Sequence, residues 1–147
     1  MGTAEHIRTL RLRAGRTEEE LADALGLTVQ GYRNVEQHDA EFESTLSIAQ
    51  SLTLARLLSA DVVELLGESK PTTPANIPAI RAVMRAQLGD SEETREALED
   101  ALDWDLRPFL DGGEGWTTVY TLEFVRGLAS VMGLDWNHVL AGVESGG

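Results

Sequence analysis

Residues 16–36 read Arg16-Thr-Glu-Glu-Glu-Leu-Ala-Asp-Ala-Leu-Gly-Leu-Thr-Val-Gln-Gly-Tyr-Arg-Asn-Val-Glu36, and this stretch decides the fold. Its first residues, Thr17–Glu20, have the spacing of a capping box, in which two side chains satisfy free backbone amides at a helix start. Gly26 permits a sharp turn because glycine has no Cβ to clash at positive φ. Thr28 can then cap a second helix. The stretch therefore predicts two short helices joined by a tight turn.

Apolar side chains close the angle between these two helices and continue at helical spacing on both sides. Those of the first half are Ile7, Leu10, Leu21, Leu25, Leu27, Tyr32, Val35, Ile48, Leu54, Leu58, Val62, Val63, Leu65 and Leu66. Spacings of three and four residues mark one face of a helix, and nothing alternates as in a strand. We expect five helices in this half, at roughly 4–15, 18–25, 28–37, 48–59 and 61–67.

The pattern resembles the helix-turn-helix of the Cro and lambda-repressor family, also called the xenobiotic-response-element family. The pairs Leu21-Ala22, Leu25-Gly26 and Val35-Glu36 carry the likeness, together with the cap at Thr28. The likeness extends from about residue 7 to residue 66. It implies an all-α, lambda-repressor-like domain of five helices, whose third helix enters the major groove of double-stranded DNA.

The resemblance also implies which side chains would meet DNA. The base-reading positions on the third helix hold Val29, Gln30 and Arg33, and Thr28 and Asn34 lie exposed beside them. Valine suits a thymine methyl group, glutamine suits adenine and arginine suits guanine. Phosphate contacts are expected from cations on and after the first helix, namely Arg8, Arg11, Arg13 and Arg16. The alternative is that these residues are only the polar face of a helix.

The net charge opposes this interpretation. The chain has 25 acidic and 12 basic residues, a formal charge of −13, whereas nucleic-acid binders carry a basic footprint. Where the family has a phosphate-touching glutamine early in the second helix, this chain has Glu18, and a carboxylate there repels a phosphate. Glu19, Glu20 and Asp23 add negative charge nearby.

The second half is predicted to be a divergent copy of the first. Three of the four prolines fall within residues 67–78, so we expect a helix-turn-helix domain at 1–69, a proline-rich linker at 70–78 and a second helical domain at 79–147. The segment at 54–66 aligns with the segment at 128–140, 74 positions later. Residues 103–111, which would form the reading helix of this copy, contain Pro108 and three aspartates and should not read DNA.

Acidic and aromatic residues concentrate in the second half. Residues 71–147 hold 13 acidic and 5 basic residues, a net charge of −8, against 12 and 7, a net charge of −5, before them. Six of the eight aromatic residues also lie there, and most are interpreted as core. Trp116 lies in a glycine-rich loop outside any periodic run, so it is a candidate anchor for self-association or for a partner protein.

Other kinds of site find no support in the sequence. There is no cysteine, and His6, His38 and His138 lack metal-ligand spacing. No glycine-rich motif has the setting of a phosphate-binding loop. We therefore expect no enzyme, no metal site and no cofactor. No apolar run is long enough to span a membrane and none follows a basic start, which favours a cytoplasmic location.

Two functions remain open. The first is a sequence-specific DNA-binding transcription regulator whose second domain supports dimerisation or regulation; a homodimer would match a two-fold operator with half-sites about 34 Å apart. The alternative is an acidic protein-interaction module, such as an antitoxin, a phage modulator or a decoy for a basic protein, that keeps the fold without binding DNA. A continuous positive strip around Arg11, Arg13, Arg16 and Arg33 favours DNA, whereas acidic side chains crossing it favour the interaction module.

Overall fold

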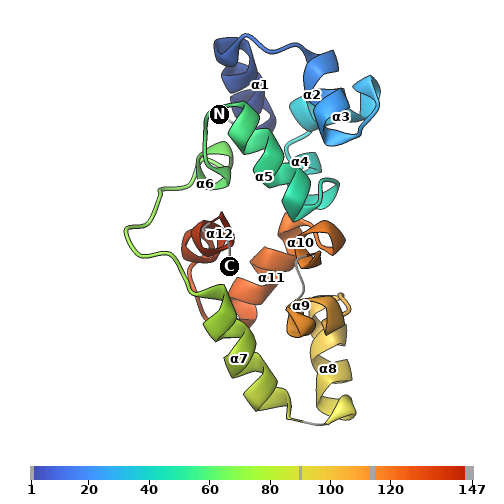
Figure 1. The fold of residues 1–147 in the computed structure, drawn as a ribbon, viewed down its shortest axis with the longest axis vertical. Helices are drawn as coiled ribbons and strands as arrows, with labels where there is room; N and C mark the ends of the chain where they lie inside the picture. The colour runs from blue at the N-terminus through green and yellow to red at the C-terminus, as the bar shows by residue number, and fades with distance from the viewer. Residues whose placement is uncertain (1, 90, 113–114, 145–147) are drawn as a thin grey trace.

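The chain is all-helical. The computed structural model describes residues 2–89, 91–112 and 115–144, and these residues form twelve α-helices and no β-strand (Figure 1). The expectation of an all-α protein is confirmed. Within this described part, none of the helices is long and apolar enough to cross a membrane.

Six helices form the first half. They are α1 (Thr3–Ala14), α2 (Glu18–Leu25), α3 (Val29–Gln37), α4 (Glu41–Ser44), α5 (Ile48–Leu57) and α6 (Val62–Leu65). Five of them lie within two residues of the expected ranges, which is the usual uncertainty of helix ends. The short helix α4 was not expected, because four residues with one buried apolar side chain, Phe42, show no helical period.

Side-chain caps set the starts of the central helices. The Thr17 hydroxyl accepts a hydrogen bond from the Glu20 amide at 3.1 Å, and the Thr28 hydroxyl accepts one from the Gly31 amide at 3.0 Å. Between these caps, Gly26 ends α2 with φ near 70°, in the left-handed region that favours glycine. Local signals therefore fix where α2 ends and α3 begins.

Six further helices form the second half. They are α7 (Ile77–Leu88), α8 (Glu92–Leu102), α9 (Arg107–Asp111), α10 (Trp116–Val119), α11 (Leu122–Met132) and α12 (Trp136–Glu144). Ser91 caps α8 and Thr17 caps α2, and the two residues are 74 positions apart. Thr121 precedes α11 and Ser47 precedes α5, with the same separation of 74 positions. The main difference is at α9, which has five residues where α3 has nine.

The segment expected as a linker, residues 70–78, runs into α7 and is attached to the second half. Helix α7 already begins at Ile77, which is fully buried, with Pro78 in the first turn, where a missing amide hydrogen costs little. The Ala75 amide donates to the His138 carbonyl of α12 at 2.9 Å. A Cβ on Gly142 would lie 2.2 Å from the Ala75 carbonyl oxygen, so this close approach of α12 requires glycine.

The two halves share one hydrophobic core. Helix α10 packs on α5, α11 packs on α4 and α12 packs on α6. At the centre, the Ile48 amide donates to the Tyr120 carbonyl at 2.8 Å, and Ser47 and Thr121 form an isolated antiparallel bridge. Helices α1–α3 therefore lie at one end of the molecule and α7–α9 at the other, with the contact between the halves in the middle (Figure 1).

Candidate nucleic-acid interface

Helix α3 has a buried face and an open face. Tyr32 and Val35 are fully buried, and the helices that pack most closely on α3 are α1, α2 and α4, all from the first half. Thr28, Gln30 and Arg33 are exposed on the other side. The helix also lies at the end of the molecule remote from the second half (Figure 1). Its outward face is therefore accessible to a ligand as large as a duplex.

The predicted base-reading residues are brought together on this face, but several already have structural partners. The Gln30 side-chain amide donates to the Asn34 side-chain oxygen at 3.2 Å, one turn along α3. The Thr28 hydroxyl serves as the helix cap, and the half-buried Val29 packs against the core. Gln30 and Asn34 can exchange their mutual hydrogen bond for a base edge, whereas Thr28 and Val29 also hold the start of the helix.

Arg33 is paired with a carboxylate. Its Nε lies 3.0 Å from Oε2 of Glu18, the first residue of α2. The Arg33 side chain is 45% exposed and that of Glu18 is 29% exposed. An ion pair this open to water contributes at most about 1 kcal/mol, so a ligand can compete for the guanidinium.

Arg11 is a core residue, which corrects its assignment as a phosphate contact. It is 8% exposed, and its Nε and Nη2 bind the Glu36 carboxylate at 2.6 and 3.1 Å. Its Nη1 donates to the Arg16 carbonyl at 3.1 Å. The hydrogen bond with Glu36 raises the pKa of Arg11 above its ordinary value. Arg11 therefore joins α1 to the end of α3 and has no free guanidinium edge to offer DNA.

The other predicted cations remain on the surface. Arg8, Arg13 and Arg16 are exposed, and Arg16 Nη1 lies 3.6 Å from Oε2 of Glu20. A hollow of about 210 Å³ beside α3 is lined by three arginines, two glutamates and Gln37. The positive strip expected around Arg11, Arg13, Arg16 and Arg33 is therefore not continuous, because Glu18 and Glu20 interrupt it.

Trp116 is buried, which corrects its assignment as a surface anchor. It is 6% exposed, and its ring meets that of Phe109 edge to face with centroids 5.1 Å apart. Trp116 begins α10, which packs on α5 at the contact between the halves. This burial could not be predicted from the sequence, because α10 has four residues, too few for an apolar period.

The junction of α8 and α9 in the second half is acidic. The hollow at the junction of α8 and α9 is lined by four carboxylates with Trp104 and Arg107, and three of these carboxylates, Asp100, Asp103 and Asp105, are exposed. Asp103 ends α8 with φ of 65°, the conformation that Gly26 has at the end of α2. This end of the molecule would repel a phosphate backbone.

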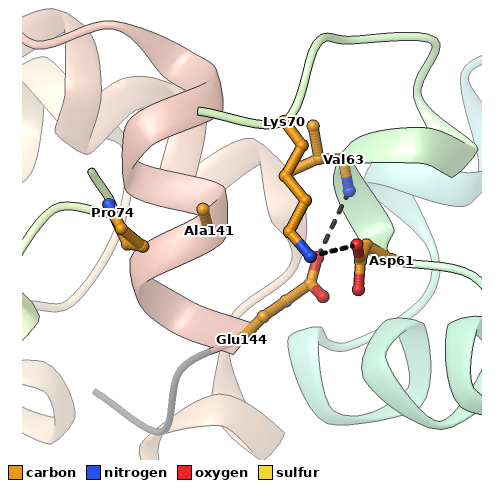
Figure 2. A pocket seen from close by; sticks show the side chains of 6 residues that line it. All are labelled: Asp61, Val63, Lys70, Pro74, Ala141 and Glu144. Atoms are coloured by element: carbon orange, nitrogen blue, oxygen red, sulfur yellow. Dashed lines mark hydrogen bonds and ion pairs between the residues drawn. The ribbon is translucent and has the colours of Figure 1, made fainter. Parts of the chain in front are cut away.

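A further polar site lies between the halves. Asp61, Val63, Lys70 and Glu144 are among the residues that line a cavity of about 210 Å³. Lys70 points to Asp61 (Figure 2), with Nζ 2.9 Å from Oδ2, and Glu144 accepts a hydrogen bond from the Val63 amide at 3.2 Å. The hydrogen bond from Lys70 lowers the pKa of Asp61, whereas burial raises the pKa of Glu144. The pKa values of these two carboxyl groups are therefore shifted in opposite directions.

Neither a metal centre nor a known relative identifies the site. No group of three metal-ligating side chains occurs among the residues described in the structure. A comparison with protein-family models, with curated proteins and with solved structures found no match to this chain. The geometry of α2 and α3 is therefore the main basis for a functional proposal.

Proposed function

We propose that the first half is a lambda-repressor-like helix-turn-helix domain that reads double-stranded DNA with α3, and that the chain is a transcription regulator. The observation that carries the proposal is the open face of α3, where Gln30 and Arg33 stand exposed at the end remote from the second half. A major groove accepts one α-helix, and glutamine and arginine are the side chains that bind adenine and guanine edges bidentately.

Arg33 is the residue on which specificity is expected to depend. To reach the O6 and N7 atoms of a guanine, its guanidinium must leave Glu18, which is feasible because the pair is exposed to water. The affinity available for phosphates is modest, because Arg11 is withheld in the core and Arg16 lies near Glu20. Binding should therefore be weak at physiological salt and strengthen as salt is lowered, with the modest slope that few phosphate contacts give.

The test is selection from a random duplex library with the full chain at low salt, followed by titration of the selected site. Arg33→Ala should weaken binding by about 1–3 kcal/mol and relax the preference at one base pair. Arg85→Ala is the matched control, since it removes an exposed arginine from α7 at the opposite end of the molecule. Failure to enrich any duplex, or equal losses in both variants, would reject the proposal.

A second candidate is favoured by the carboxylates near α3. Glu18 binds Arg33 and Glu20 lies near Arg16, which suits an acidic module that docks a basic protein. Such a module would bind a lysine- and arginine-rich peptide in low salt and bind no duplex under the same conditions. Glu18→Gln separates the two functions, because it should strengthen DNA binding and weaken binding of the basic peptide.

A further inference from the structure

The contacts between the halves are reciprocal. Counted in chain order, α4, α5 and α6 correspond to α10, α11 and α12. Helix α4 packs on α11, the counterpart of α5, while α5 packs on α10, the counterpart of α4. Helices α6 and α12, which are counterparts of each other, also pack together. This exchange of partners is the signature of a two-fold, isologous interface.

The centre of the interface has the same symmetry. Ser47 and Thr121 occupy the position before α5 and before α11, and they pair directly in an antiparallel bridge. At a two-fold axis, equivalent residues of the two partners meet each other and run in opposite directions. The pairing of Ser47 with Thr121 therefore locates a pseudo-two-fold axis between the halves.

The second half covers the surface that a second copy of the chain would need. Leu46 and Ile48 at the start of α5 and Tyr120 opposite them are fully buried. At the edge, Arg126 of α11 binds Glu43 of α4, with Nη2 and Oε1 2.7 Å apart. The α4–α6 face is thus occupied within the chain.

We infer that this chain is a single-chain counterpart of a two-fold dimer, with one working reading helix, and that it binds one non-palindromic half-site as a monomer. The inference rests on the proposed function. In a two-fold arrangement, α9 takes the place of the second reading helix, and Figure 1 shows α2–α3 and α8–α9 on the same side of the molecule. Helix α9 has only five residues, and exposed Asp103 and Asp105 precede it. The DNA at that end is repelled rather than read.

The first experiment combines light scattering, duplex selection and the stoichiometry of the complex. We expect a 16.0 kDa monomer, a single asymmetric motif and one chain per duplex. A palindromic motif with two chains per duplex would overturn this inference and leave the proposed function standing. If no duplex is selected in low salt, the proposed function fails and this inference fails with it.

A second experiment tests the repulsion at the acidic end. Binding is compared for a duplex limited to the selected motif and for one extended on both sides. In the native chain the extension should lower the affinity, because the added phosphates meet the carboxylates at the α8–α9 end. In the triple variant Asp100→Asn, Asp103→Asn and Asp105→Asn, the extended duplex should gain roughly fivefold in low salt, because phosphates no longer face these carboxylates.

Asparagine suits these positions for structural reasons. It tolerates the left-handed conformation of Asp103, and its side-chain oxygen can still accept the Arg107 amide that Asp105 accepts at 3.0 Å. The matched control is Glu64→Gln with Glu68→Gln and Asp135→Asn, three exposed carboxylates away from the α8–α9 junction. An equal gain in this control, or no gain in the triple variant, would contradict repulsion at the α8–α9 end.

Discussion

Replacing Glu18 by glutamine should strengthen DNA binding while it weakens the fold. Glu18 is the first residue of α2, and its carboxylate holds Arg33 at 3.0 Å. Glutamine keeps the length of the side chain and removes its charge. Arg33 is then free to meet a base, and the start of α2 repels a phosphate less, because only Glu19 and Glu20 keep their charge in its first turn.

The gain can be estimated from two exposed interactions. In the native chain, breaking the Arg33–Glu18 ion pair so that Arg33 can reach a base costs at most about 1 kcal/mol of binding free energy. A carboxylate about 6 Å from a phosphate adds a repulsion of about 0.7 kcal/mol in water. Removing both gives about 1–2 kcal/mol, or roughly 5- to 30-fold in Kd. The same change loses about 0.3–1 kcal/mol of stability, because a negative charge at a helix N-terminus is favourable.

The assay is fluorescence anisotropy with the selected duplex, paired with urea unfolding of the same proteins. Glu68→Gln is the control, because it removes an exposed carboxylate in the segment between α6 and α7. Affinity and stability should change in opposite directions for Glu18→Gln, which excludes a general improvement of the fold. An unchanged or weaker affinity for DNA would refute the role given to the Glu18–Arg33 pair.

Four other variants test the structural assignments. Glu36→Ala should lower the free energy of unfolding by about 3 kcal/mol, since it strands the buried Arg11 without its partner; a loss under 1 kcal/mol would place Arg11 outside the core. Trp116→Ala should lower the free energy of unfolding by about 3–5 kcal/mol in the same urea assay, because it empties a buried site. A variant that stays stable but changes its self-association would instead support Trp116 as a surface anchor. Burial raises the pKa of Glu144, so its stabilising contribution is present in acid and lost as the pH rises through the folded pKa. Glu144→Gln should be more stable than the native chain at pH 7, and this difference should shrink as the pH falls through the raised folded pKa and be absent below about pH 4; a difference that persists in acid would contradict this. Lys70 lowers the pKa of Asp61, so its contribution is present at neutral pH and lost as the pH falls through the folded pKa; the instability of Asp61→Asn should fade in acid, and a pH-independent loss would contradict this.

The sequence predicted the α2–α3 unit well because its signals are local. The caps at Thr17 and Thr28, the turn at Gly26 and the apolar period all lie within one short stretch, and each acts on its near neighbours. Helices α4 and α10 were not predicted, because a four-residue helix contains one turn and cannot show a period.

Roles that depend on distant partners could not be predicted from the same patterns. Arg11 looks like any surface arginine until Glu36, 25 positions later, is placed beside it. Glu18 could be identified as a source of repulsion, but its contact with Arg33 depends on the angle between α2 and α3. Trp116 was assigned to the surface because its loop has no period, whereas its burial comes from packing between the halves.

The internal contact between the halves changes how DNA binding should depend on protein concentration. A regulator that dimerises through a free surface must first associate, and association costs entropy. At low protein concentration, its occupancy of DNA therefore rises with more than the first power of the protein concentration. Here the equivalent contact is made within one chain, through α4–α6 and α10–α12. Occupancy should therefore follow a simple hyperbola even when the protein is dilute. Under the proposed function, the tethered, acidic second half therefore lowers the affinity that a second reading helix would give, and in return DNA binding needs no second copy of the chain.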